Sequence, residues 1–190
     1  MNVQPTLILG ANIMMNKIFN FLFTLLIVCF CESVIAQDVP QEEHKMLKMD
    51  EGTWDAQITM LVGKNEQETQ YQAKEVNTMI GNLWSIGKLQ GNIAGMDYEG
   101  FATLGYDTMQ KKYVGTWIDS ITAVITQMEG SYDEKTKTLT LFYTTFDKDG
   151  RAEQRKNIMI YRNSKVRDFT MFIEKSGEWQ KAMKIHYTRT

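Results

Sequence analysis

The stretch Lys137–Glu174, KTLTLFYTTFDKDGRAEQRKNIMIYRNSKVRDFTMFIE, decides the predicted fold of this chain. It contains three runs rich in β-branched and aromatic residues, at 137–146, 152–162 and 165–174. The turn formers Asp147–Gly150 and Asn163–Ser164 separate these runs at hairpin spacing. Consecutive strands with such short links pair in antiparallel fashion, because a parallel crossover needs roughly a dozen residues.

The same pattern extends along the chain toward both ends. Further strands are predicted at 52–62, 67–79, 82–90, 95–106, 112–119, 122–132 and 178–189. A meander of this size either splits into two sheets or closes on itself, and closure removes the exposed edges. The sequence therefore predicts an all-β fold, a single antiparallel up-and-down β-barrel of about ten strands. A short helix at Glu42–Met49 is expected to act as a lid or plug at one barrel end.

The predicted strands carry apolar and polar residues on both faces. In the strand 112–119, Tyr113, Trp117 and Asp119 share one face, while Val114 and Ile118 share the other. A packed interior demands one apolar face, whereas a barrel with a partly hydrated cavity tolerates polar groups on its inner wall. The pattern therefore favours a barrel that holds a ligand. A register shifted by one residue would mix the two faces equally well.

Residues Met15–Ala36 have the layout of a secretory signal peptide, with Lys17 before an apolar run and small residues at the end. The apolar run is shorter than the roughly 20 residues that span a bilayer. We therefore expect an exported protein, periplasmic or secreted, with no membrane span after processing. The expected parts are a signal peptide at 1–36 with Met15 as an alternative start, an N-terminal segment with the short helix at 37–51, and the barrel at 52–190.

Cysteine content and charge exclude several classes of function. Both cysteines, Cys29 and Cys31, lie in the predicted signal peptide, so the processed chain would contain no thiol. Disulfides, thiolate metal sites and cysteine nucleophiles are then excluded. The formal net charge is −2, and Lys and Arg are spread through the chain rather than gathered on one face. This distribution argues against a nucleic-acid partner.

Sequence signatures of enzymes are missing. The chain has no Gly-x-Ser-x-Gly elbow, no phosphate-binding glycine loop and no His-Glu-x-x-His helix. Asp147–Gly150 resembles the start of a calcium loop, but Ile158 stands where the bidentate Glu belongs. The two histidines, His44 and His186, are too few for a four-ligand zinc site without cysteine. We expect no catalysis, no bound metal and no cofactor.

Several short motifs follow one another along the predicted barrel. They are Gly52-Thr53-Trp54, Gly105-Tyr106-Asp107, Lys112-Tyr113-Val114, Trp117-Ile118-Asp119, Gly130-Ser131-Tyr132-Asp133 and Tyr187-Thr188-Arg189. In this order they are similar to those of an uncharacterised, mostly bacterial and often exported family, domain of unknown function 1579. The opening Gly-x-Trp resembles the start of the calycin barrels, the lipocalins, fatty-acid-binding proteins and their relatives. The resemblance implies a calycin-like barrel and supplies no activity.

The calycin resemblance also suggests roles for residues at the barrel end. In calycins the opening Trp packs against an Arg of the last strand, and Trp54 and Arg189 hold those places here. The resemblance implies a structural cation–π contact that closes the barrel. A second interpretation pairs Tyr187 with Arg189, which share one strand face. A guanidinium beside a phenol could bind a carboxylate head group, as the Arg-x-Tyr pair does, in the opposite order, in fatty-acid-binding proteins.

Other candidate residues are aromatic, acidic or histidine side chains. Trp84 and Trp117 are predicted to line an apolar cavity, although aromatic residues are also the ordinary filling of a barrel. Asp119 either caps a turn or reaches into the barrel mouth as a polar determinant. The nitrobindins, a heme-binding branch of calycin-like barrels, ligate iron with a His of a late strand. His186 shares its face with Lys184, so a surface position is the favoured interpretation.

The sequence thus predicts an exported barrel that binds a small apolar or amphipathic molecule, such as an acyl chain, without catalysis. Two alternatives stay open. One is a structural or interaction protein of the cell envelope with a packed barrel, whose outer face or residues 38–50 meet a partner. The other is heme binding through His186.

Overall fold

A computed structural model describes residues 38–62 and 67–190 of this chain. The predicted signal peptide, residues 1–36 with Met15, lies outside the described residues. Among the residues that are described, no helix has the length and hydropathy needed to cross a membrane.

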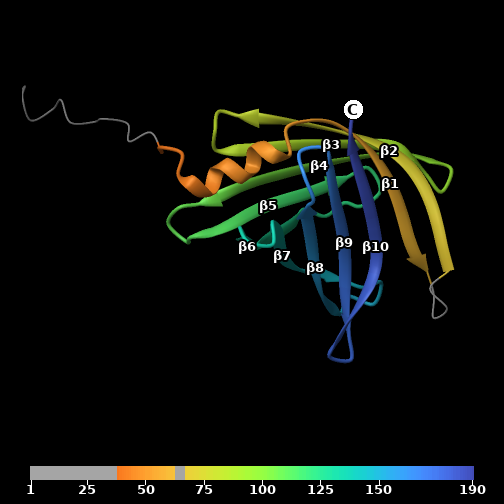
Figure 1. The fold of residues 1–190 in the computed structure, drawn as a ribbon. Helices are drawn as coiled ribbons and strands as arrows, with labels where there is room; N and C mark the ends of the chain where they lie inside the picture. Colours follow the sequence, from red (N-terminus) through yellow and green to blue (C-terminus); the bar gives the residue numbers. More distant parts are fainter. Residues whose placement is uncertain (1–37, 63–66) are drawn as a thin grey trace, which may run out of the picture. The chain divides into compact units, whose positions relative to one another are not determined.

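The described residues form one 3-10 helix followed by ten strands (Figure 1). The elements are η1 (Glu42–Met49), β1 (Gly52–Val62), β2 (Gln67–Ile80), β3 (Trp84–Ile93), β4 (Met96–Asp107), β5 (Lys112–Asp119), β6 (Thr126–Asp133), β7 (Thr138–Phe146), β8 (Ala152–Tyr161), β9 (Val166–Lys175) and β10 (Glu178–Arg189). Each strand pairs with its sequence neighbours, and β10 pairs with β1 to close the barrel. The predicted all-β antiparallel barrel is confirmed, and the short helix lies where it was expected.

Strand register decides which side chains face the barrel interior. Trp54, Ala56 and Ile58 of β1 are all nearly inaccessible to solvent, so these alternate positions point inward. Their partners across the ladder point the same way, for example Tyr187 opposite Ala56 and Ile185 opposite Ile58. Antiparallel pairing carries this alternation around the barrel. It assigns an inner or outer position to every paired residue.

The helix η1 fills one end of the barrel. Leu47 has no exposed surface, and it packs with Met46 in a core cluster that includes Leu139 of β7. The Tyr113 hydroxyl of β5 donates a hydrogen bond of 2.7 Å to the carbonyl oxygen of Glu43. We call this closed end the η1 end and the opposite end the open end. The helix thus acts as the plug that the sequence suggested.

The ladder between β6 and β7 is incomplete. Its last pair toward the open end is Glu129 with Phe142, although β6 begins at Thr126 and β7 continues to Phe146. Over that length β6 still pairs with β5, and β7 still pairs with β8. The facing edges of β6 and β7 are therefore not joined to each other near the open end. The barrel wall is therefore interrupted between these two strands.

Candidate ligand-binding site inside the barrel

The η1 end contains a buried charged residue that the sequence interpretation did not identify. Arg167 of β9 is only 2% exposed, and it forms ion pairs with Asp50 and Glu75. Its guanidinium carbon lies 4.4 Å from the ring centroids of both Trp54 and Tyr187. Two carboxylates and two aromatic faces thus compensate the desolvated cation. In sequence, Arg167 differs from the other Arg residues only by its place in the alternation of β9.

Two tyrosine hydroxyls complete this network. Tyr161 donates to both carboxylate oxygens of Asp50 at 3.1 Å, and Tyr187 donates to Glu75 at 2.8 Å. Burial raises the pKa of Asp50 above its ordinary value, against the opposing effect of the Arg167 charge. Burial first, and the nearby carboxylate second, raise the pKa of both tyrosines. Most of these polar groups bind one another, and Nε of Arg167 is the one atom of the network that is buried without a hydrogen-bond partner among the described residues. The network therefore holds the barrel end together.

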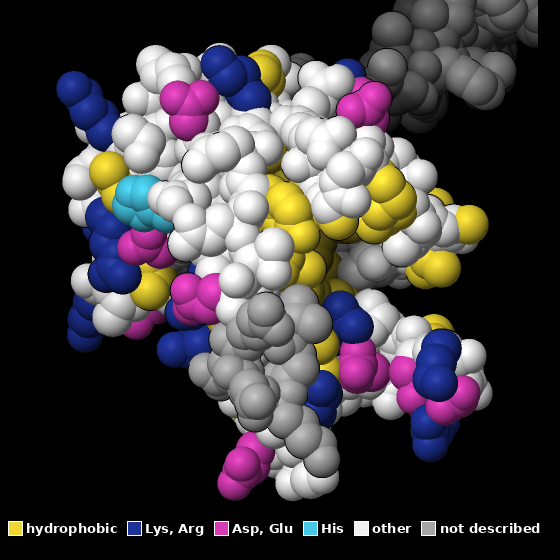
Figure 2. Space-filling model, turned by 90° about the vertical axis from the view of Figure 1, so that its right-hand side faces the viewer, with side chains coloured by type: hydrophobic (Ala, Val, Ile, Leu, Met, Phe, Trp, Pro, Cys, Tyr) yellow, Lys and Arg dark blue, Asp and Glu magenta, His cyan; other side chains and the backbone are white. Residues whose placement is uncertain are grey.

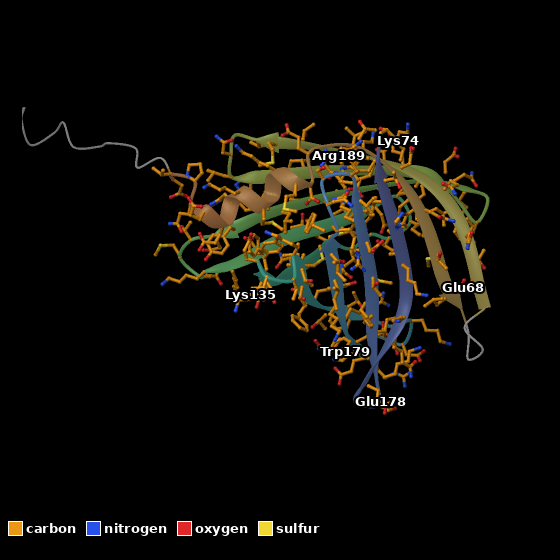
Figure 3. The ribbon with its side chains drawn as sticks, viewed as in Figure 1. Glu68, Lys74, Lys135, Glu178, Trp179 and Arg189 are labelled. Carbon is orange, nitrogen blue, oxygen red and sulfur yellow. The ribbon has the colours of Figure 1, made fainter. Side chains whose placement is uncertain are left out.

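Arg189 lies at the η1 end of β10, far from Trp179 at the other end of that strand (Figure 3). Its guanidinium carbon is 4.1 Å from the Trp54 ring centroid, which is the contact implied by the calycin resemblance. Its nitrogens donate to the carbonyl oxygens of Met49 at 2.8 Å, Ser164 at 2.7 Å and Glu51. Arg189 therefore ties the segment after η1 and the β8–β9 turn to the last strand.

This geometry corrects the second role considered for Tyr187 and Arg189. The Tyr187 hydroxyl donates to Glu75, and each guanidinium nitrogen of Arg189 donates to a backbone carbonyl. The two side chains do not point together into the barrel, because Arg167 occupies the position beside the Tyr187 ring. The expected carboxylate site at this pair is therefore not supported.

The prediction that Trp84 lines an inner cavity is wrong. Ser85, the next residue of β3, is buried on the inner face, so Trp84 points outward and is 39% exposed. A Cβ atom added to Gly105 of the neighbouring strand would come within 2.4 Å of the Trp84 ring. The indole thus lies flat on the outer wall over a glycine. Sequence alone favours the large apolar residue as the buried one, but the register of β3 places the small serine inside.

Trp117 and Asp119 do come together on the inner wall of β5. The Trp117 indole nitrogen donates to Asp119 at 3.0 Å, and Asp119 also accepts from the backbone nitrogens of Ile121 at 3.0 Å and Thr122 at 2.8 Å. Burial alone would raise the pKa of Asp119, but these hydrogen bonds hold it below its ordinary value. Burial and the Asp119 charge raise the pKa of the neighbouring Tyr98 to about 12. Asp119 thus caps a turn near the open end and accepts a hydrogen bond from the Trp117 indole.

His186 lies on the outer wall, since Ile185 and Tyr187 on either side of it are buried. Its Nδ1 is 2.7 Å from Asp168, which also binds Arg162 at 2.7 Å. Heme in the barrel cannot reach this ring without reversing the register of β10. The heme interpretation is therefore not supported.

A second group of polar side chains lies on the inner wall of β7 and β8 toward the open end. Tyr143 donates to Asn157 at 3.1 Å, and Arg155 donates through Nε to Glu153 at 2.9 Å. Arg155 also donates through Nη2 to the same Glu153 oxygen, and its Nη1 contacts the sulfur of Met171 at 3.9 Å, which is a weak acceptor. The Thr145 hydroxyl is buried with no hydrogen-bond partner among the described residues. Two donors on this wall thus lack a strong acceptor.

Methionine lines the inner wall around these groups. The inward-facing methionines at the middle of the barrel are Met60, Met128, Met159, Met171 and Met183. Each is partly exposed, although each points away from the outer surface. Solvent therefore reaches these inward-facing side chains. Figure 2 shows hydrophobic side chains along a hollow in one face, with acidic and basic side chains around it.

The family model for proteins of unknown function DUF1579 matches residues 39–189. The chain belongs to this family. A search of curated proteins found no match. The DUF1579 match spans η1 and all ten strands, so the barrel with its plug is the family's structural unit.

Two solved structures are similar to this DUF1579 barrel. The protein Rv2717c from M. tuberculosis aligns with a TM-score of 0.57 at 10% identity, over 80% of this chain and 99% of that chain. The S-type phycobiliprotein lyase CPES from Guillardia theta aligns with a TM-score of 0.50 at 11% identity, over 80% of this chain and 98% of that chain. At these identities the similarity shows the fold alone.

Proposed function

We propose that the barrel binds an amphipathic molecule with a single alkyl chain and a carboxylate head group, without catalysis. The observation that carries this proposal is the partial exposure of inward-facing methionines beside Arg155. Methionine side chains are flexible and polarizable, so they can pack against alkyl chains of different length. Burial of each methylene contributes about 0.8 kcal/mol.

The polar wall of β7 and β8 suits the head group. A carboxylate oxygen would accept from Arg155 Nη1 in place of the Met171 sulfur, and from the unpartnered Thr145 hydroxyl. Glu153 already pairs with the guanidinium through Nε and Nη2 and offsets its charge. A bound carboxylate would therefore gain hydrogen bonds more than long-range attraction. The predicted signal peptide adds a proposed location for this binding, outside the cytoplasm.

A rival function is a structural role with a packed barrel. Solid packing would bury the inward-facing methionines as completely as Ile58 and Ile185 are buried. Their partial exposure supports the binding proposal instead. One structure with a similar fold is a phycobiliprotein lyase.

Fluorescence titration with 11-(dansylamino)undecanoic acid, followed by displacement with laurate, tests the proposal. Arg155→Gln should weaken laurate binding about tenfold, because a charged hydrogen bond is lost. The matched control is Arg162→Gln, which removes an Arg paired with Asp168 on the outer wall and should leave affinity unchanged. Absence of displacement in the unaltered protein, or equal affinities in both variants, would overturn the proposal.

A further inference from the structure

The gap between β6 and β7 forms a slot in the barrel wall. We define the slot by the edges that face each other without pairing, Thr126–Met128 of β6 and Tyr143–Phe146 of β7. Ordinary barrel closure would continue the ladder beyond the pair Glu129 and Phe142, because unpaired strand edges expose polar backbone groups. The interruption is therefore a local feature of the wall.

A hollow of about 880 Å³ runs along the outer wall from Trp84 of β3 to Gln154 of β8 and includes this slot. Its lining includes the outward-facing residues Gln127, Phe142 and Thr144 on either side of the gap. It also includes Met128 and Tyr143, whose side chains point into the barrel. Met128 and Tyr143 belong to the two unpaired edges, so the hollow borders the slot on both sides. The hollow thus lies on the outer side of the slot.

The slot leads directly to the polar wall proposed to hold the head group. Asn157 of β8 accepts a hydrogen bond from the Tyr143 hydroxyl at 3.1 Å and donates one to the Met128 sulfur at 3.4 Å. It therefore links the edges of β6 and β7 from the inner side. The contact to sulfur is weak and readily replaced. Arg155 lies two residues before Asn157 in β8 and faces the same side of the strand, toward the interior. A molecule that passes the slot therefore reaches Arg155 at once.

Apolar side chains surround the outer mouth of the slot. Ile125 is 65% exposed and Phe146 is 69% exposed, and both lie at the ends of the two unpaired edges. The connection Ser120–Ile125 before β6 carries no charged residue. Exposed apolar groups of this kind mark places where apolar ligands or surfaces are met. An alkyl chain can therefore stay in apolar contact from the outer mouth to the methionine-lined interior.

We propose that the slot between β6 and β7 is the access route by which a carboxylate amphiphile enters and leaves the barrel. This inference rests on the proposed binding function and adds the path to it. The head group passes Asn157 to reach Arg155, and the alkyl chain follows past Met128 and Phe142.

Crosslinking the slot tests the route. In the full chain with Cys29→Ala and Cys31→Ala, the pair Gln127→Cys and Thr144→Cys is joined by a short bis-maleimide, and mass spectrometry verifies the link. Stopped-flow fluorescence then measures association and dissociation of 11-(dansylamino)undecanoic acid. Both rate constants should fall about tenfold or more, while equilibrium affinity changes far less, since a blocked path alters rates in both directions.

The matched control crosslinks Gln90→Cys with Glu99→Cys, a pair joined across the complete β3–β4 ladder on the outer wall. Its rates should equal those of the unlinked protein. Phe142→Ala, which needs no crosslink, should raise both rate constants, whereas Phe101→Ala on the outer face of β4 should not. Retained binding with unchanged rates in the linked slot and in Phe142→Ala would overturn the route alone. Absence of probe binding to the unlinked protein would overturn the binding function itself.

Discussion

Replacement of Arg167 by methionine should destabilise the protein strongly and in a pH-dependent way. The change removes two ion pairs and two cation–π contacts at 4.4 Å. It leaves Asp50 and Glu75, whose side chains are 9% and 12% exposed, without a cation. Breaking a buried pair in this way costs about 3–5 kcal/mol. That is a large part of the roughly 5–15 kcal/mol that stabilises a domain.

The pH dependence follows from Asp50. Burial raises its pKa above the model-compound value of 3.8, so the folded state binds the proton more tightly than the unfolded state. Binding of this proton stabilises the folded protein fully at pH values below the pKa of Asp50 in the unfolded state. This stabilisation is lost as the pH rises through the pKa of Asp50 in the folded state. Without Arg167, which lowers this pKa, the loss extends to higher pH. The deficit of Arg167→Met relative to the unaltered protein should be largest at neutral pH and smaller near about pH 4.

Urea unfolding followed by tryptophan fluorescence, at several pH values, measures both effects. Arg162→Met is the matched control, since its ion pair with Asp168 is exposed and should contribute less than about 1 kcal/mol. If Arg167→Met does not fold, adding Asp50→Asn and Glu75→Gln should restore folding, because the uncompensated charges are then removed. A deficit below about 1 kcal/mol, or one that does not change with pH, would refute the reasoning.

Three further outcomes are expected. In urea unfolding, Arg189→Ala should lower the free energy of unfolding by up to about 2 kcal/mol and Trp54→Ala by about 3–5 kcal/mol. The double variant should lose less than the sum of these two values because the side chains are in contact, and strict additivity would contradict this. Trp84→Ala should leave laurate affinity unchanged while Trp117→Ala weakens it, as measured by probe displacement, and the reverse order would place the ligand outside the barrel. His186→Ala should leave the absorption spectrum after hemin addition identical to that of the unaltered protein, whereas a lost Soret shift would restore the heme interpretation.

The fold could be predicted from the sequence because its signals are local. Each turn, such as Asp147–Gly150, lies between two apolar runs, and short links leave antiparallel pairing as the one solution. The site was harder to predict, because a side chain's face depends on register across the whole barrel. Trp84 and Ser85 differ by one position, and only the pairing with β4 shows that the serine is inside. Arg155 and Arg167 were missed for the same reason.

The same dependence does not affect residues two positions apart in one strand. Trp117 and Asp119 lie two residues apart in one strand, so they share a face in any register. Their shared face could therefore be predicted without knowledge of the barrel, whereas their hydrogen bond is seen only in the structure. The Arg167 network instead joins the segment after η1 with β2, β8, β9 and β10, and no pattern within one strand contains it.

The pairing of β1 with β10 has a consequence for the order of folding. A ribosome makes β1 first, yet its second neighbour exists only after β10 has been synthesised. Until then β1 has one free edge, and Trp54 lacks both the Arg167 and the Arg189 guanidinium. Contacts so far apart in sequence form late and slowly. A nascent chain of this protein therefore stays open along one seam throughout its synthesis, and it needs protection from aggregation for that whole period.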